Sequence, residues 1–343
     1  MSIDTTDLSS DPVADRVVRV QVGIDAAVVA NHQVTIRETT RDGQVQLSRF
    51  HASPTIAGLT RLSERLAAHP HVMAVAEPTS MTWLGLHVAL QEAGCDLALV
   101  GTRHAARLRG AISGKNKSDV IDADVLAMAG DVFTLSPLRP PAPPQLALRR
   151  AVVRRGKLVI DGNRSRRRLI SLARWAFPDV WQEFAGSWPT AVAVLTRWPD
   201  LTALASARRS SVTNVVAAHT RGVPDVDARA ERIRAAAART TAFWDGHLDL
   251  EALAWETSEH LRDIALAAEQ IERATDQAHH YWADLYGDDS LLLSVPGMGP
   301  MTAPTIRAFF ADASAFPTAK AAAAYVGLTP STWSSGTVVQ PSR

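Results

Sequence analysis

Four acidic residues are spaced so that they could share one site. Asp25 ends a stretch of alternating apolar residues, and Glu77 ends a short apolar run. Asp119 and Asp122 lie three residues apart, so their side chains would project about 60° from each other on a helix. Converging carboxylates repel one another unless cations neutralise them, and two Mg²⁺ ions about 3.5–4 Å apart are the usual solution in phosphodiester chemistry. A metal site is therefore one interpretation of this spacing.

The alternative interpretation of the acidic residues is structural. Asp119 would cap the N-terminus of a helix after Lys117 and Ser118, and the other carboxylates would be solvated. Asp124 would point about 140° away from Asp119 and is excluded from the cluster. A third interpretation, an actin-like sugar kinase built on residues 22–25, would need further glycine-rich phosphate loops, and the α/β part of the sequence has none.

Basic residues are concentrated in two segments of a chain whose net charge is only +1. Such clusters favour contacts with the phosphate backbone of nucleic acid, and a solvated helix face is the alternative. One cluster precedes Asp119, and the other, at 149–174, has ten basic residues and one acid, Asp161. The predicted phosphate contacts are Arg103, Arg107, Arg109, Lys115, Lys117, Arg149, Arg150, Arg154, Arg155, Lys157, Arg164, Arg166, Arg167 and Arg168.

Two motifs near the C-terminus add weaker signals. Pro296-Gly297-Met298-Gly299 is a glycine-rich turn like those that present N–H groups to phosphate in helix–hairpin–helix modules, which makes Gly297 and Gly299 candidate DNA contacts. Ser334 and Ser335 precede a glycine in a predicted loop, where such residues mostly form turns. Spacing alone makes neither serine a nucleophile. Tyrosine recombination is disfavoured, because the three tyrosines have no Arg-His-Arg context.

The elements that must position these residues follow from apolar periodicity. Strands are predicted at 18–25, 32–37, 44–51, 71–76 and 96–100, with a hairpin turn at Asp42 and Gly43. Helices are predicted at 55–68, 83–93 and 118–129. This order predicts an α/β domain with a buried face on its first strand and parallel later strands, as in the RNase H-like fold. Active sites gather at the carboxyl ends of parallel strands, so Asp25 and Glu77 are expected to converge there.

Beyond the α/β domain the sequence is predicted to be all-α, with long helices. The expected parts are a disordered leader at 1–15, an RNase H-like catalytic domain at 16–136, a proline-rich linker at 137–144, a basic and then coiled-coil-like helical region at 145–290, and a C-terminal helical domain at 291–343. One cysteine excludes a disulfide framework. The sequence has no signal peptide and no apolar run of about 18 residues, so a soluble cytoplasmic protein without membrane contact is expected.

Taken together, these segments resemble a known family. Gly23-Ile24-Asp25, Ala76-Glu77-Pro78-Thr79 and residues 116–123 (Asn-Lys-Ser-Asp-Val-Ile-Asp-Ala) look like the DEDD signature of its RuvC-like domain. Residues 294–299 and 324–330, followed by Ser335-Gly336, look like its C-terminal transposase domain. The family is the IS110 family of insertion-sequence transposases, which are guided by a bridge RNA. The resemblance covers about residues 18–343 in matching order.

The resemblance implies DNA recombination by strand cleavage and exchange. Asp25, Glu77, Asp119 and Asp122 would be catalytic carboxylates that bind Mg²⁺, as a pair of ions, and Ser335 would be the nucleophile that links covalently to DNA. Ser334 is the neighbour to test as an error in that alignment. The implied partners are donor and target DNA, a structured noncoding guide RNA, and further copies of the chain in a dimer or tetramer. The implied location is the bacterial nucleoid.

Two features depart from the family pattern. Pro-Thr-Ser follows Glu77, where the family usually has a glycine nearby, and the sequence stops eight residues after Ser335, where members continue with a basic helical tail. A truncated copy or a natural short form is therefore expected. The rival interpretations are a metal-dependent nuclease or junction resolvase that uses the carboxylates alone, and an inactive remnant that binds nucleic acid without cutting it.

Overall fold

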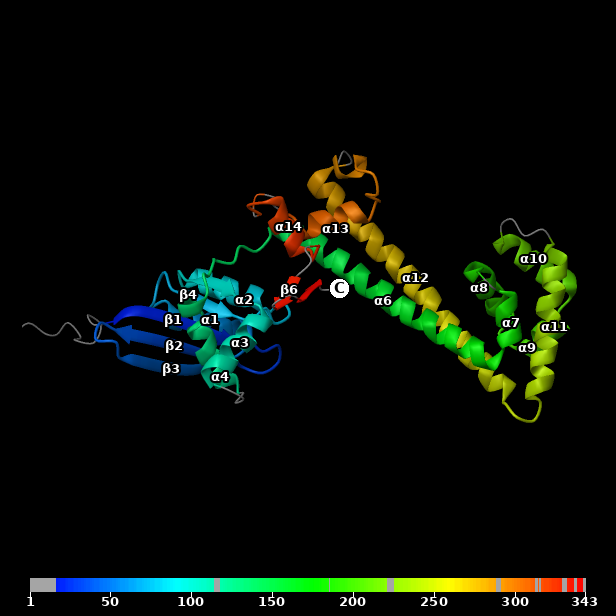
Figure 1. Ribbon diagram of the computed structural model, residues 1–343, viewed down its shortest axis with the longest axis horizontal. Helices are drawn as coiled ribbons and strands as arrows, with labels where there is room; N and C mark the ends of the chain where they lie inside the picture. The colour runs from blue at the N-terminus through cyan, green and yellow to red at the C-terminus, as the bar shows by residue number, and fades with distance from the viewer. Residues whose placement is uncertain are drawn as a thin grey trace, which may run out of the picture. The chain divides into compact units, whose positions relative to one another are not determined.

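The computed structural model describes residues 17–113, 118–184, 186–220, 225–287, 291–311, 314, 316–328, 332–335 and 338–341, the last two segments as backbone only. The chain divides into two compact units, Met1–Pro140 and Pro141–Arg343 (Figure 1). The division falls inside the proline-rich stretch 137–144. The leader expected at 1–15 lies outside the described residues.

The first unit is built on a five-stranded mixed sheet. Its strands are β1 (Val17–Asp25), β2 (His32–Thr40), β3 (Val45–Ala52), β4 (Met73–Ala76) and β5 (Asp96–Leu99). They lie in the order β3-β2-β1-β4-β5, with β1, β2 and β3 antiparallel and with β1, β4 and β5 parallel. This is the order of the RNase H-like fold, so the predicted fold class is confirmed.

Helices cover both faces of this sheet. They are α1 (Ile56–Leu66), α2 (Thr82–Glu92), α3 (Thr102–Ser113), α4 (Asp119–Ala127) and the short α5 (Ala129–Val132). On one face, apolar side chains of β1 such as Ile24 pack with Leu62 of α1 and Leu86 of α2. On the other face, Val75 of β4 packs with Leu108 of α3 and Leu126 of α4. The prediction of a single buried face on the first strand was wrong, because α4 buries the second face as well.

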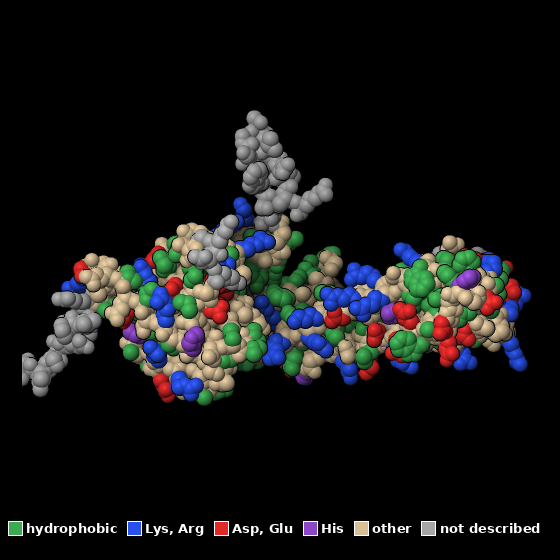
Figure 2. All heavy atoms as spheres, turned by 90° about the horizontal axis from the view of Figure 1, so that it is seen from below, with side chains coloured by type: hydrophobic (Ala, Val, Ile, Leu, Met, Phe, Trp, Pro, Cys, Tyr) green, Lys and Arg blue, Asp and Glu red, His purple; other side chains and the backbone are tan. Residues whose placement is uncertain are grey.

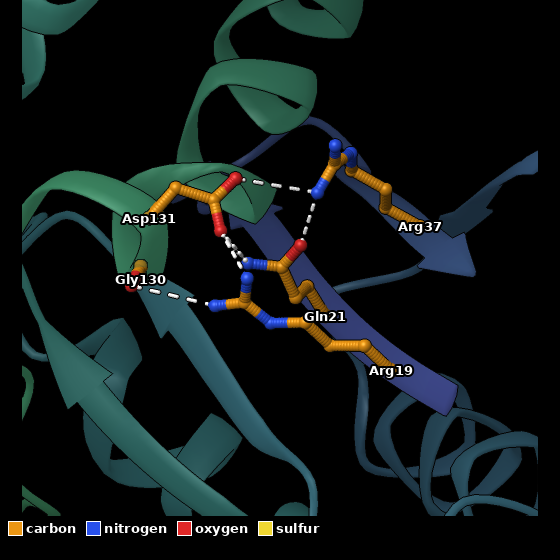
Figure 3. A network of polar contacts seen from close by, with 5 residues as sticks. All are labelled: Arg19, Gln21, Arg37, Gly130 and Asp131. Carbon is orange, nitrogen blue, oxygen red and sulfur yellow. Dashed lines mark hydrogen bonds and ion pairs between the residues drawn. The ribbon is translucent and has the colours of Figure 1, made fainter. Parts of the chain in front are cut away.

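A polar network joins the α4–α5 segment to the sheet (Figure 3). Asp131 of α5 accepts hydrogen bonds from Gln21 of β1 at 2.9 Å and from Arg37 of β2 at 3.3 Å. Arg19 of β1 forms an ion pair with Asp131 at 2.6 Å and also donates to the carbonyl oxygen of Gly130 at 3.4 Å. One carboxylate thus holds α5 across two strands, and this fixes the helix pair on its face of the sheet.

Two long antiparallel helices form the frame of the second unit. They are α6 (Pro143–Ala176) and α12 (Leu250–Tyr286), with 34 and 37 residues, or about 51 and 55 Å at 1.5 Å per residue (Figure 1). Arg155 of α6 donates to the Thr275 hydroxyl of α12 at 2.8 Å. A Cβ on Gly162 would lie 3.2 Å from the Cβ of Ala267, so this glycine allows a close approach of the helices.

Five shorter helices form a bundle at one end of this pair (Figure 1). They are α7 (Pro178–Glu183), α8 (Trp188–Arg197), α9 (Leu201–Ser206), α10 (Arg209–His219) and α11 (Val226–Trp244). Their core contains the fully buried Phe177, Leu195, Leu204 and Ile233. The Ala-rich stretch from Asp227 to Tyr286, predicted as one or two long helices, forms α11 and α12.

The C-terminal elements follow α12, and the first α-helix among them packs on the opposite ends of the long helices. They are the 3₁₀ helix η2 (Leu291–Ser294), α13 (Thr302–Phe309), α14 (Ala319–Tyr325) and a hairpin of β6 (Thr332–Ser335) and β7 (Val338–Pro341). Gln145 of α6 donates to the Arg307 carbonyl oxygen at 2.6 Å and accepts from the Tyr286 hydroxyl of α12 at 2.7 Å. The hairpin is a finding, because a loop was predicted at Ser334 and Ser335 within a helical C-terminal domain. In the described part of the chain, no helix is long and apolar enough to cross a membrane.

Candidate active site

Asp25 and Glu77 lie at the ends of adjacent parallel strands. In the pairing of β1 with β4, Gly23 is opposite Val75 and Ile24 is opposite Ala76. The next aligned positions along the two strands are Asp25 and Glu77. Successive side chains of a strand alternate between its faces, so both residues belong to the face that Val75 shares with α3 and α4. The strand ends therefore meet as the sequence predicted.

Gly23 brings α4 against β1 beside these strand ends. A Cβ on Gly23 would lie 2.0 Å from the carbonyl oxygen of Ala123 and 2.3 Å from the backbone nitrogen of Ala127. Both are backbone atoms of α4, so a side chain could be accommodated only by displacing the helix. The glycine of the Gly-Ile-Asp motif is thus explained by helix–strand packing. It lets α4 lie directly against β1, and this contact sets the distance between the α4 carboxylates and the strand.

Helix α4 begins with a side-chain cap and carries two of the predicted carboxylates in its first turn. The hydroxyl of Ser118 accepts a hydrogen bond from the Ile121 backbone N–H at 3.3 Å. Ser118 is therefore the N-cap, and the interpretation of Asp119 as the cap was wrong. Asp119 is exposed, whereas Asp122 is 7% exposed. An acidic side chain in the first turn is also favoured by the helix dipole.

The guanidinium of Arg109, on α3, lies within the electrostatic reach of three of these carboxylates. Its Nη1 donates to Oδ1 of Asp122 at 2.7 Å. This hydrogen bond raises the pKa of Arg109 above its ordinary value, and the negative charges of Asp122, Glu77 and Asp25 raise it further. Arg109 therefore contacts Asp122 directly, and the charges of Glu77 and Asp25 at the strand ends act on it through space.

The residue types of this cluster suit a divalent ion, but their arrangement does not. Carboxylate oxygens are the ligands that Mg²⁺ prefers. Asp122, however, is engaged by Arg109, and in the described residues no three His, Cys, Asp or Glu side chains are grouped closely enough to hold an ion. Metal binding by Asp25, Glu77, Asp119 and Asp122 stays a prediction.

Asp124 faces a different set of partners, as its place on the helix predicted. Its carboxylate accepts two hydrogen bonds from Arg49 of β3, at 2.9 and 2.8 Å, and one from the Thr35 hydroxyl of β2 at 2.8 Å. The hydrogen bond to Asp124 raises the pKa of Arg49 above its ordinary value. Asp124 therefore ties α4 to the edge of the sheet and is not part of the cluster around Arg109.

The predicted phosphate contacts that precede Asp119 have different surroundings in the structure. Arg103 and Arg107 are exposed on α3. Arg109 forms an ion pair with Asp122 and is partly buried, whereas a side chain that contacts phosphate is expected to be exposed and unpaired. Lys115 and Lys117 lie outside the described residues. Sequence reasoning missed the pairing of Arg109 with Asp122, because only the fold shows which of several arginines meets which carboxylate.

The second group forms a linear face on α6. One side of α6 carries a row of six charged residues whose spacing alternates between four and three residues over about 27 Å. They are Arg150, Arg154, Lys157, Asp161, Arg164 and Arg168, of which five are basic. All five are exposed. Arg164 pairs with Asp161 at 2.8 Å, and the other four form no ion pair within the described part of the chain. Figure 2 shows Lys and Arg side chains gathered along the long helices.

The remaining basic residues of α6 have different surroundings. Arg149 lies over the Phe309 ring and Arg166 over the Trp188 ring, at 4.8 and 4.3 Å from the ring centroids. Arg155 donates to Thr275 of α12. Arg167 is exposed but lies about 100° from the neighbouring Arg168 around the helix axis. The face defined by Arg150, Arg154, Lys157, Arg164 and Arg168 is called the basic face of α6 below.

The glycine-rich motif forms a tight turn before α13. The Met298 N–H donates to the Val295 carbonyl oxygen at 3.0 Å, and Gly297 has φ +85°, which a glycine at the third position of such a turn adopts readily. The Thr302 N–H donates to the Gly299 carbonyl oxygen at 3.0 Å. His279 of α12 contacts the Pro300 carbonyl oxygen at 2.9 Å, which fixes the turn on the long helix. DNA contacts by Gly297 and Gly299 stay a prediction.

Ser334 and Ser335 are the last two residues of β6. In the hairpin Ser334 is opposite Val339 and Ser335 is opposite Val338. Ser335 is therefore the last residue of a strand, although a loop was predicted. The two serines belong to the second unit, and the carboxylates belong to the first.

Comparisons with known proteins agree with this arrangement. Residues 22–178 match the DEDD transposase model of the IS110 family, and residues 289–343 match the transposase model of the IS116/IS110/IS902 family. A Streptomyces coelicolor protein, whose name describes it as a mini-circle transposase for IS117, is 30% identical over 339 residues. The alignment covers 92% of this chain and 77% of that protein. This chain belongs to the IS110 family of transposases.

Proposed function

We propose that this chain cuts and rejoins DNA strands through a covalent serine intermediate, under the guidance of a bound structured RNA. The observation that supports the proposal most is the pairing of β1 with β4, which aligns Asp25 with Glu77 at one end of the RNase H-like sheet, on the face that also carries the Asp122–Arg109 pair. In a transposase family, such a carboxylate cluster is suited to phosphodiester chemistry. Asp119, one helical turn before Asp122, completes the proposed set of four.

The proposed chemistry assigns different roles to the two units. The carboxylates would use divalent metal, which transposases of the DEDD type generally require. The Ser335 Oγ would form a bond to a DNA phosphorus, and the displaced deoxyribose oxygen would leave with a proton. A serine hydroxyl is a weak nucleophile and must be activated. The nearest histidine in the sequence is His280, so we propose that a carboxylate of the first unit, in the same or a partner subunit, accepts the Ser335 proton.

The proposed nucleic-acid partners use separate surfaces. The basic face of α6 presents positive charges about one helical turn apart, except at Asp161, where the gap is two turns, and this spacing suits contacts along a phosphate backbone. Arg103, Arg107, Gly297 and Gly299 would add contacts to donor and target DNA. A dimer or tetramer would bring two DNA partners together. Sequencing the RNA that copurifies with the full chain tests the guide: one discrete structured RNA is expected.

The test of the nucleophile is formation of a covalent protein–DNA adduct. Labelled donor DNA and the copurifying RNA are incubated with each variant, and adducts are resolved on a denaturing gel. Ser335→Ala and Asp119→Ala should each abolish the adduct, and the double variant should be no worse than either single one, because the groups act as a unit. If the two sites belong to different subunits, a mixture of the single variants should regain some activity.

The controls separate this proposal from its rivals. A normal adduct in Ser335→Ala would move the nucleophile to Ser334. A normal adduct in a Ser334→Ala, Ser335→Ala variant would refute the serine intermediate. DNA cleavage without any adduct, abolished by Asp25→Ala, would instead identify a metal-dependent nuclease. Binding of RNA and DNA with no cleavage would identify an inactive nucleic-acid-binding protein.

A further inference from the structure

The row of residues that forms the basic face of α6 continues past Arg168 to an exposed tryptophan. Trp175 follows Arg150 at a spacing that brings it to within about 20° of Arg150 around the helix axis, and about 38 Å farther along it. The Trp175 side chain is 52% exposed. The basic face therefore ends on an aromatic ring, where α6 meets the five-helix bundle (Figure 1).

Trp175 lines a cavity of about 290 Å³ that also involves α7 and α11. Phe243 and Trp244 of α11 contribute two more rings to it, and it is called the aromatic cavity below. Trp244 is fixed, because its indole N–H donates to the Ala176 carbonyl oxygen at 2.7 Å. The rings of Trp175 and Phe243 each meet the Trp244 ring nearly at right angles, with centroid distances of 6.4 and 4.8 Å. One fixed indole therefore orders two exposed rings.

One wall of the aromatic cavity is polar. Asp179 of α7 accepts a hydrogen bond from Nε of Arg239, on α11, at 2.9 Å, and both side chains line the cavity. A carboxylate acceptor and guanidinium donors thus lie beside the aromatic rings. A planar ring with donors and acceptors on its edge would match both kinds of wall. A nucleobase has this chemistry.

We propose that the aromatic cavity binds an unpaired base of an RNA strand whose phosphates follow the basic face of α6. This inference rests on the proposed function, because it takes RNA as a partner. A positively charged track combined with aromatic rings is the usual arrangement for binding single strands. Duplex DNA keeps its bases paired and stacked, whereas the loops of a structured RNA present unpaired bases. The aromatic cavity therefore suits RNA and not duplex donor or target DNA.

The charge of the row favours nucleic acid over a second copy of this chain. The row from Arg150 to Trp175 carries five basic residues and one acid, Asp161. Two copies that docked through this same surface would place like charges opposite each other, which is unfavourable. Phosphates neutralise such a row and release counterions on binding.

The test is the affinity of the full chain for a fluorescent, unstructured 12-nucleotide uridine RNA, measured by anisotropy. Trp175→Ala should weaken binding about tenfold, within the range found for loss of one stacked base. Trp175→Phe keeps an aromatic face and should retain most of the affinity. Trp255→Ala, a change of a 66% exposed tryptophan on α12 outside the cavity, should leave the affinity at the wild-type value.

An abasic oligomer with the same ribose–phosphate backbone separates stacking from contacts with phosphate. It should bind more weakly than the uridine RNA, and equally to the wild type and Trp175→Ala. Salt gives a second readout. Trp175→Ala should keep the slope of log affinity against log salt, since stacking releases no counterions, whereas Arg168→Gln should lower that slope by about 0.7 for a single strand.

Thermal unfolding of each variant checks that it folds. If Trp175→Ala does not fold, Phe243→Ala carries the same expectation, because it removes a ring that is 71% exposed. Uridine RNA affinity at the wild-type value in both variants would overturn the inference. An equal loss of affinity for the abasic oligomer would also overturn it, because the ring would then act without a base.

Two further outcomes would assign the aromatic cavity to another partner. Tighter wild-type binding of the deoxyribose oligomer than of the uridine RNA would overturn the choice of RNA. A wild-type dimer that Trp175→Ala dissociates, with unchanged RNA affinity, would assign the rings to a second copy. Failure of the proposed function is distinguishable, since absence of a copurifying guide RNA or of the Ser335 adduct would leave binding of the uridine RNA unchanged.

Discussion

A Cβ on Gly23 would lie 2.0 Å from the carbonyl oxygen of Ala123, so β1 and α4 meet backbone to backbone. Gly23→Ala should therefore displace α4 and lower the free energy of unfolding by at least about 3 kcal/mol, since the clashing atoms cannot rotate away. Gly110→Ala on α3 is the matched control, because nothing lies within 4 Å of the added Cβ. That control should be neutral or stabilising by up to about 1 kcal/mol.

Urea denaturation of the two variants measures this difference. A Gly23→Ala protein that unfolds at the wild-type urea concentration would show that the helix does not pack on the strand as described. Displacement of α4 should also separate Asp122 from the strand ends. A folded Gly23→Ala variant is therefore expected to lose strand cleavage.

Asp124→Ala should destabilise the protein while leaving the carboxylate cluster intact. The substitution removes the acceptor of the Thr35 hydroxyl, which is fully buried, and frees Arg49. An unsatisfied buried hydroxyl costs about 1–3 kcal/mol, and unfolding by urea should show a loss of this size. Thr35→Val should recover part of the loss in the double variant. Mn²⁺ affinity should be unchanged, and a strong decrease would place Asp124 in the metal site.

Binding of nucleic acid should depend on the basic face of α6 and not on charge alone. Arg154→Gln with Lys157→Gln should lower the slope of log affinity against log salt by about 1.8 for a duplex, because each phosphate contact contributes about 0.9. Arg174→Gln, exposed on the same helix but about 120° from this face, should leave the slope unchanged. Asp161→Asn should increase affinity, since it removes the acid within the face. Fluorescence anisotropy at several salt concentrations checks each outcome.

Stability should fall at acidic pH because of His32. Its ring is 2% exposed, and its Nδ1 accepts a hydrogen bond from the Ala27 N–H at 3.1 Å, so the folded state holds the neutral form. Burial lowers the pKa of His32 below its ordinary value of 6.5. The unfolded state then binds a proton first, and stability is lost as pH falls from about 6.5 through the lower folded pKa.

Urea midpoints at pH 7.5 and pH 5.5 test the role of His32. His32→Asn keeps a side-chain acceptor without a titrating ring and should show a smaller difference between the two midpoints. His51→Asn, a change on an exposed residue of β3, is the control and should keep the wild-type difference. An identical pH dependence in His32→Asn and the wild type would contradict the assignment.

The sequence by itself determined the five strands and three of the helices of the first unit, and it identified the candidate carboxylates. Alternation of apolar residues locates β1, and the turn residues Asp42 and Gly43 locate the hairpin between β2 and β3, because these signals are local. The order of strands and helices predicted parallel later strands and a convergence of Asp25 with Glu77, and the structure added the pairing of β1 with β4 that aligns them. The family motifs were recognisable without coordinates, since they consist of short, ordered segments.

Only the tertiary structure decided which charges meet. Asp122 and Asp124 are two residues apart on one helix, but one faces Arg109 of α3 and the other faces Arg49 of β3. The basic segment before Asp119 was not predicted as a helix, and α3 forms there because Ala105 and Leu108 are buried against the sheet. Ion pairs and close backbone approaches, such as that at Gly23, depend on contacts between residues distant in sequence, so neither periodicity nor composition encodes them.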